Sequence, residues 1–211
     1  MHVSCSSCVE AHREFPEAIA RIAELGFRYV DLLVIEGMKH LYPSDLVSGR
    51  GPSVPEIASL LRKTGLRVSS LNCGFSRPLI TLAQERATIE REFQAMLDLA
   101  AEVECGMVSI GIGTYNAQTG RVECFDRVLE GLEWLASRPA AKDFRICFEP
   151  HSGSPAETSA DATYLAKRVW PDVGIAYDPS HFVMHPEFGP LTDSEPLLEY
   201  TVHVHVRNAA P

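Results

Sequence analysis

Short apolar segments alternate with amphipathic helical segments along the whole of this 211-residue chain. Seven apolar runs are predicted to be β-strands: His2–Ser6, Tyr29–Ile35, Leu66–Leu71, Met107–Ile112, Phe144–Phe148, Gly174–Tyr177 and Thr201–Val206. Most of them are apolar throughout rather than at every second position, which is typical of strands buried on both faces of a parallel sheet. This alternation predicts an α/β protein, with either an open doubly wound sheet or a closed barrel.

The segments between these strands have helical periodicity. Six helices are predicted: Phe15–Leu25, Val54–Lys63, Leu82–Val103, Phe125–Ser137, Ala160–Val169 and Glu195–Tyr200. Apolar residues recur at helical spacing in the first of them, and Gly26 ends it. The second carries Pro55 in its first turn and Gly65 just past its end, the usual positions of these residues at helix ends.

Two features favour the barrel over the open sheet. Polar residues gather at the C-terminal ends of many different strands, where the active sites of (β/α)8 barrels lie. No glycine-rich phosphate loop follows the first strand, as it usually does in a nucleotide-binding open sheet. We therefore predict an α/β fold, a (β/α)8 TIM barrel with about seven βα units visible, forming a single domain over residues 1–211. Because a closed barrel needs an eighth strand and typically has about 250 residues, we expect a further C-terminal quarter beyond Pro211.

Composition and charge narrow the range of partners. Apolar residues make up 45% of the chain and charged residues 22%, as in an ordinary soluble globular protein. The net charge of −9 argues against a nucleic-acid-binding surface, which would need clustered Lys and Arg. The chain has no apolar run long enough to span a membrane, and its N-terminus lacks the features of a signal peptide. We therefore expect a cytoplasmic protein that binds neither nucleic acid nor membrane.

Six cysteines are spread along the chain without the spacing of a small disulfide scaffold. Cys5-Ser-Ser-Cys8 forms a C-x-x-C pair, which is found in redox sites and in halves of zinc sites. No second such pair is present to complete a structural zinc site. Reduced thiols in a cytosolic barrel are the expectation, with a redox-active pair as the alternative.

Side chains that bind metals mark the ends of the last three predicted strands. Glu149 follows the fifth strand, Asp178 follows the sixth, and His205 lies at the end of the seventh. The spacing between successive residues of this set is slightly less than the roughly 30 residues that one strand and its crossover helix occupy. Two carboxylates and an imidazole are a mixed oxygen and nitrogen set that suits Mn²⁺, Zn²⁺ or Co²⁺. We predict that Glu149, Asp178 and His205 bind a metal. His203, on the same strand face as His205 but farther from the rim, is expected either to support the ligands from behind or to lie in the barrel interior.

On these residues the chain resembles the xylose isomerase-like TIM-barrel superfamily. Within it, the nearest group is the sugar phosphate isomerase/epimerase branch, which includes ketose 3-epimerases and inosose dehydratases. In that family strand five ends in a metal-binding Glu, strand six in Asp with His three residues later, and strand seven in a His-x-Lys-Asp-like segment. The matching segments here are Phe148-Glu149-Pro150-His151, Asp178-Pro-Ser-His181 and His205-Val-Arg207-Asn208. Asn208 stands where Asp is usual, and the family's strand-eight Glu has no counterpart in this sequence.

The resemblance implies a mechanism and roles for individual residues. A divalent metal ion (Mn²⁺, Zn²⁺, Co²⁺ or Mg²⁺) would bind two substrate oxygens and polarise a carbonyl, which makes the neighbouring C–H more acidic. Glu149 would serve as catalytic base or acid besides being a ligand. His181 would bind a substrate hydroxyl, and His151 and Arg207 would orient the remaining oxygens. The partner would be a small carbohydrate, and the pairing of barrels in this group is consistent with a homo-oligomer.

Three functions from different classes fit this pattern. The first is a divalent-metal-dependent sugar or sugar phosphate isomerase/epimerase. The second is an AP endonuclease-like phosphodiesterase, which would need additional histidines at the ends of strands three and four. Those ends read Leu71-Asn-Cys-Gly74 and Ile112-Gly-Thr-Tyr115, without histidine. The third is a non-catalytic barrel that binds a metal or a sugar. The sequence favours the first.

Overall fold

The computed structural model describes residues 2–115, 120–183 and 191–207, so Asn208 lies outside the described residues. The chain forms two compact units. Unit 1 comprises Met1–Arg77 and Glu85–Ser109, and unit 2 comprises Pro78–Gln84 and Ile110–Pro211. Among the helices of the described residues, none combines the length and the apolar character that a membrane span requires.

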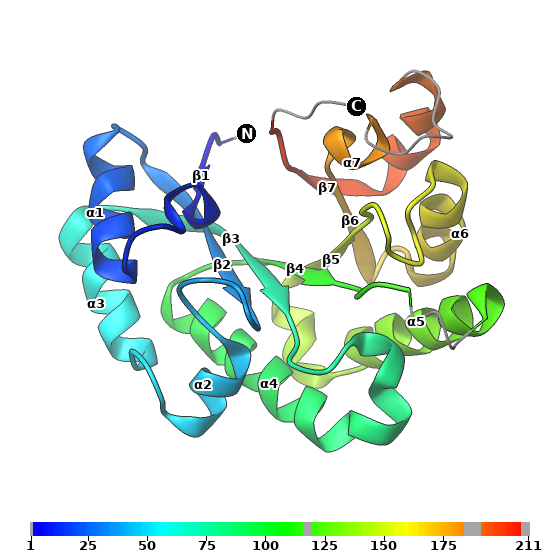
Figure 1. The fold of residues 1–211 in the computed structure, drawn as a ribbon, viewed down its shortest axis with the longest axis horizontal. Coiled ribbons are helices and arrows are strands. Elements are labelled where there is room, and N and C mark those ends of the chain that lie inside the picture. Colours follow the sequence, from blue (N-terminus) through cyan, green and yellow to red (C-terminus); the bar gives the residue numbers. More distant parts are fainter. Residues whose placement is uncertain (1, 116–119, 184–190, 208–211) are drawn as a thin grey trace. The chain divides into compact units, whose positions relative to one another are not determined.

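Unit 1 contains three parallel strands in the order β1-β2-β3. Its elements are β1 (Cys5–Ser6), a 3-10 turn η1 (Ser7–Glu10), α1 (Phe15–Glu24), β2 (Tyr29–Ile35), α2 (Pro43–Ser48), α3 (Val54–Thr64), β3 (Arg67–Gly74) and most of α4 (Leu82–Glu102). Helices α1 and α3 lie side by side in Figure 1 and pack on each other. The core between the helices and the sheet includes Ile19, Ile22, Val30, Leu32 and Ile57, all fully buried.

The ends of helix α3 show why this segment is helical. Ser53 and Glu56 form a capping box, in which the Ser53 N–H donates to Glu56 Oε2 at 2.7 Å. At the other end Gly65 has φ +72°, a left-handed conformation that glycine adopts without steric cost. The predicted helix Val54–Lys63 is therefore confirmed, and it extends by one residue to Thr64.

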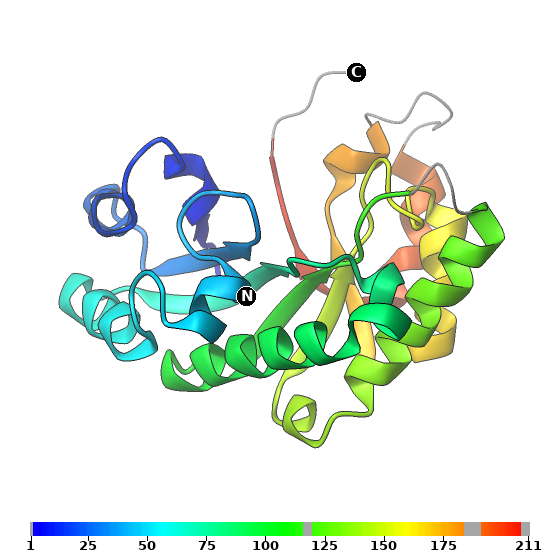
Figure 2. The same cartoon turned by 60° about the horizontal axis from the view of Figure 1, so that its bottom comes forward.

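In its described residues, unit 2 contains the parallel strands β5-β6-β7, in that order. Its elements are η2 (Leu79–Thr81), α5 (Arg121–Ala136), η3 (Pro139–Asp143), β5 (Arg145–Glu149), α6 (Ser159–Val169), β6 (Val173–Tyr177), α7 (Pro179–Val183), η4 (Leu191–Tyr200) and β7 (Thr201–Val204). Strand β4 (Met107–Gly111) runs across the boundary between the units. Helices α5 (green) and α6 (yellow) lie side by side in Figure 2 and pack on each other.

The pairing of β6 with β7 is shifted by one residue. Ile175 pairs with Thr201, but the next residue, Ala176, pairs with His203, so Val202 is an additional residue in β7. Gly174 makes room for it, because a Cβ at Gly174 would lie 2.8 Å from both Val202 methyl groups. Successive side chains of a strand point to opposite faces of the sheet, so one additional residue moves every later side chain to the other face. The shift therefore sets the direction of His203 and of the residues after it.

Several predicted elements are corrected by the structure. The first strand is only Cys5–Ser6, because the chain turns into η1 and the Cys8 N–H donates to the Ser6 hydroxyl at 3.3 Å. The last predicted helix is the 3-10 helix η4, which contains Pro196, a residue that cannot donate an α-helical hydrogen bond. Helices α2 and α7 were not predicted. Strand β2 has the predicted bounds Tyr29–Ile35.

Candidate metal centre

Three adjacent strands of unit 2 end in the residues that the sequence selects as metal ligands. Glu149 is the last residue of β5, Asp178 directly follows β6, and His205 directly follows β7. The strands are parallel neighbours, so their carboxyl ends meet at one edge of the sheet. The His205 N–H also donates to Tyr177 O at 2.9 Å, which continues the β6–β7 pairing as far as the ligand position.

The ligand atoms of Glu149, Asp178 and His181 all lie within 4.8 Å of one another. His181 Nε2 is 3.9 Å from Glu149 Oε1 and 3.8 Å from Asp178 Oδ2. Oxygen and nitrogen ligands lie about 2.0–2.2 Å from a transition-metal ion, so two ligands of one ion are at most about 4.4 Å apart. Both distances meet this limit. His181 can therefore share a divalent ion with either carboxylate, and the two carboxylates lie within 4.8 Å of each other. The sequence assigns His181 to substrate binding, whereas its position here suits a metal ligand.

His205 reaches this group through Glu149. Its Nδ1 lies 2.8 Å from Glu149 Oε1, and its side chain is 19% exposed. Carboxylate–histidine contacts of this kind orient ligands and tune their basicity around metal ions. The ring of His203 packs edge-on against the ring of His205, with centroids 4.9 Å apart. His203, in β7, and His205, just after it, thus lie side by side.

Asp178 is held in place by the turn that follows it. Its side chain is 2% exposed, and Oδ1 accepts a hydrogen bond from the Ser180 N–H at 2.8 Å, in the first turn of α7. Oδ2 lies 3.0 Å from Arg207 Nε. A carboxylate this deeply buried needs such hydrogen bonds and a positive charge nearby. Ser180 is the supporting residue that sequence analysis missed.

The imidazole of His181 lies in the short helix α7, and its side chain is 17% exposed. Burial lowers the pKa of His181, and the positive charge of Arg207 lowers it further. The neutral form is therefore favoured near pH 7, and this is the form of histidine that accepts a metal ion. The Ser152 N–H lies 3.4 Å from His181 Nδ1.

His151 and Arg207 complete the set of residues selected from the sequence. The His151 ring lies 5.5 Å from the His181 ring, between centroids, and its Nδ1 lies 2.9 Å from Ser152 O. The Arg207 side chain is 49% exposed, and its Nη2 lies 2.9 Å from His181 Nε2. All six selected residues are thus linked in one region of unit 2. Their individual roles stay predictions.

The loop after β5 is fixed from a second segment of unit 2. The Tyr115 N–H donates to Gly153 O at 2.9 Å, and the Tyr115 hydroxyl donates to Pro155 O at 3.3 Å. Between these two contacts Ser154 is fully buried, and its hydroxyl accepts the His151 N–H at 3.3 Å. Tyr115 therefore holds the turn that carries His151. No motif marks it in the sequence.

The comparison of the sequence with known families decides the fold family. Residues 19–211 match the family model described as "Xylose isomerase-like TIM barrel". The chain belongs to this family. The resemblance and the barrel fold class predicted from the sequence are both confirmed. A search of curated protein sequences gives no significant match.

Several solved structures have folds similar to that of this chain. The 3-keto-D-glucoside 4-epimerase from E. coli is 17% identical with a TM-score of 0.75, and the match covers 99% of this chain and 79% of that chain. AP endonuclease family 2 from Brucella melitensis is 19% identical with a TM-score of 0.76, covering 98% and 79%. D-psicose 3-epimerase from Clostridium cellulolyticum H10, solved with D-tagatose, is 14% identical with a TM-score of 0.75, covering 98% and 73%. These identities establish the fold alone.

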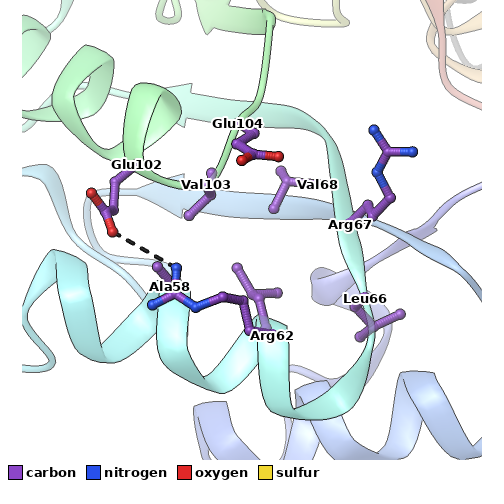
Figure 3. Close-up of a pocket in the computed structure, with 9 residues that line it drawn as sticks. Ala58, Arg62, Leu66, Arg67, Val68, Glu102, Val103 and Glu104 are labelled. Carbon is purple, nitrogen blue, oxygen red and sulfur yellow. Dashed lines mark ion pairs between the residues drawn. The ribbon is translucent and has the colours of Figure 1, made fainter.

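Unit 1 has a separate charged cavity of about 210 Å³ (Figure 3). It lies between the C-terminal ends of α3 and α4 and the amino end of β3. Arg62 and Glu102 pair across it at 3.8 Å, and its other charged lining residues are Arg67 and Glu104. In barrels the amino ends of strands serve stability, while active sites lie at the carboxyl ends. We assign no function to this cavity.

Proposed function

We propose that the protein is a divalent-metal-dependent sugar or sugar phosphate isomerase/epimerase. The proposal rests on the convergence of Glu149, Asp178 and His181 at the carboxyl ends of neighbouring parallel strands. His205, at the end of the third strand, contacts Glu149. Two of the similar structures are sugar epimerases, which supports a carbohydrate as the substrate. A cytoplasmic location and a homo-oligomer stay predictions.

The proposed ligands are Glu149, Asp178 and His205, with His181 as a further donor. The histidines favour Mn²⁺, Zn²⁺ or Co²⁺ over Mg²⁺, which prefers oxygen ligands. When bound, such an ion polarises a substrate carbonyl and makes the neighbouring C–H more acidic. The contact between His205 Nδ1 and Glu149 Oε1 fixes the direction of the carboxylate.

The proton transfer is assigned to Glu149. Its carboxylate, 15% exposed, would remove the proton from the hydroxyl-bearing carbon next to the carbonyl and return it to the former carbonyl carbon. The proton of that hydroxyl passes to the former carbonyl oxygen, which completes the isomerisation. Epimerisation needs a second group on the opposite face of the substrate. His181, His151 and Arg207 donate hydrogen bonds that orient the remaining oxygens. Arg207 is the most exposed of the three, so its guanidinium lies on the open side of the site.

Hydrogen exchange in D₂O tests the proposal. The protein, loaded in turn with Mn²⁺, Co²⁺, Zn²⁺ or Mg²⁺, is incubated with hexuloses, pentuloses, inososes and their phosphates. We expect deuterium at the carbon next to the carbonyl of one substrate, measured by NMR. Glu149→Gln should slow this exchange by at least roughly 10²–10⁴-fold, the usual contribution of a general base, because the variant loses both the base and a metal ligand. Glu133→Gln, which changes an exposed carboxylate on α5, should leave the rate unchanged. Exchange with none of these substrates by a metal-loaded protein would favour a non-catalytic binding barrel.

The nuclease alternative has its own test. The net charge of −9 and the absence of histidine in residues 71–74 and 112–115 argue against it. The same protein preparations are incubated with an oligonucleotide that contains an abasic site. We expect no incision with any of the four ions. Incision by the wild type that Glu149→Gln abolishes would replace the isomerase/epimerase proposal with a phosphodiesterase.

A further inference from the structure

The guanidinium of Arg207 contacts two of the side chains that form the candidate metal centre. Its Nε lies 3.0 Å from Asp178 Oδ2, and its Nη2 lies 2.9 Å from His181 Nε2. These two acceptor atoms are only 3.8 Å apart, close enough to be bridged by a single ion. Nη2 also lies 3.1 Å from His181 Nδ1, so it rests against the imidazole ring and not on a single lone pair. The guanidinium therefore occupies the Asp178 oxygen that a divalent cation would need, and it crowds the His181 nitrogen beside it.

Burial and charge explain this contact. The Asp178 side chain is 2% exposed, and a buried carboxylate without a positive partner is strongly unfavourable. Arg207 supplies positive charge through N–H donors and has no acceptor of its own. Its side chain is 49% exposed, and its Nε also donates to the Ser180 hydroxyl at 2.6 Å. It can therefore turn toward solvent without leaving its own charge buried.

We propose that Arg207 is the counter-cation of Asp178 in the metal-free protein, and that a divalent cation binds by displacing it. This rests on the metal site of the proposed function. A guanidinium 3.0 Å from Asp178 Oδ2 and 2.9 Å from His181 Nε2 repels and crowds a divalent cation at these atoms, so the two positive groups compete for them. Once displaced, the guanidinium is available for substrate oxygens. Metal binding therefore precedes and enables the use of Arg207 in substrate binding.

Mn²⁺ affinity, measured by isothermal titration calorimetry, tests the displacement directly. Arg207→Gln should bind Mn²⁺ roughly tenfold more tightly than the wild type or better, because no cation has to leave. Arg207→Lys keeps the positive charge and should bind close to the wild-type affinity. Arg127→Gln removes a partly exposed positive charge, paired with Glu123, from α5 of the same unit and is the matched control. It should also bind as the wild type does, which excludes an effect of net charge alone.

Thermal unfolding gives a second readout that needs no activity. In EDTA, Arg207→Gln should unfold at a lower temperature than the wild type, because Asp178 loses its counter-charge. At saturating Mn²⁺ the difference should disappear. A folded Arg207→Gln variant with unchanged or weaker Mn²⁺ affinity, beside a wild type that binds, refutes the displacement alone. If no folded variant and no wild type binds a divalent ion, the proposed function fails together with this inference.

Discussion

Replacing Gly174 by alanine should destabilise the protein and disturb the candidate metal centre at the same time. The new Cβ would lie 2.8 Å from both methyl groups of Val202 and 3.1 Å from the Tyr200 carbonyl oxygen, where ordinary contacts are 3.4–4 Å. The valine cannot rotate away easily, since its χ1 is restricted, and the carbonyl belongs to the backbone. Strand β7 must therefore move away from β6.

The expected cost lies in the upper part of the range for overpacking. Inserted methyl groups in packed interiors usually cost about 1–3 kcal/mol, and two rigid overlaps place this variant at about 2–3 kcal/mol. For a chain of this size that corresponds to a fall in Tm of roughly 4–12 °C. Since His205 follows β7 directly, the 2.8 Å contact between His205 and Glu149 should be lost or lengthened, and metal affinity should fall.

Urea unfolding and thermal scans measure the effect, with two control variants. Gly106→Ala has no atom within 4 Å of the new Cβ and should change stability by less than about 0.5 kcal/mol. Val202→Ala removes both methyl groups, so the double variant should be more stable than the sum of the single changes by about 1–2 kcal/mol. A Gly174→Ala protein as stable as the wild type, or purely additive effects in the double variant, would refute the reasoning.

Three further predictions concern residues of unit 1. Burial raises the pKa of the Cys105 thiol to about 11, so little reactive thiolate forms there near neutral pH. An aromatic disulfide reagent should therefore react quickly with the exposed Cys8, and with Cys105 only after unfolding. More than one rapidly reacting thiol per chain would contradict this. Burial lowers the pKa of His40 below 6.5, so below about pH 6.5 the unfolded chain takes up a proton that the folded chain does not. Stability should then decrease as the pH falls from 6.5 toward the folded pKa, and urea titrations should show a smaller decrease in His40→Asn; an equal decrease would count against it. Glu92 is 2% exposed and accepts hydrogen bonds from the Ser76 N–H, at 2.9 Å, and from the Ser76 hydroxyl. Glu92→Ala should lower the free energy of unfolding, measured in urea, by about 2–3 kcal/mol. A decrease below about 0.5 kcal/mol would show that this contact is not needed for stability.

Much of the fold could be predicted because its segments carry strong local patterns. Strand β2 is an apolar run with turn residues on each side, and α3 has a serine cap, a proline in the first turn and a glycine at its end. Helix α2 has Pro43 at its start and Gly49 in a left-handed conformation at its end, yet it was missed. Its six residues are too few for an apolar period to show. End signals alone therefore mark a short helix that periodicity cannot detect.

The candidate site was predictable only where position along a strand decides it. Glu149, Asp178 and His205 stand at strand ends, so their proximity follows from a parallel sheet. The place of His181 beside Glu149 depends on α7 starting immediately after β6, which the hydrogen bond from Ser180 N–H to Asp178 stabilises. The direction of His205 depends on the one-residue shift between β6 and β7. The first feature is local, but α7 has only five residues, too few for a helical period to show. The second depends on how β7 pairs with β6, so the sequence of β7 alone could not predict it.

The central claim is that Glu149 and Asp178 bind a divalent ion at the end of β5 and β6. Equilibrium dialysis against Mn²⁺, Zn²⁺ or Co²⁺ followed by elemental analysis tests it most directly. We predict one bound ion per chain in the wild type and in Glu133→Gln, and none in Glu149→Gln or Asp178→Asn that remain folded by circular dichroism. A wild type without a bound ion, or folded Glu149→Gln and Asp178→Asn proteins that keep the full content, would contradict it.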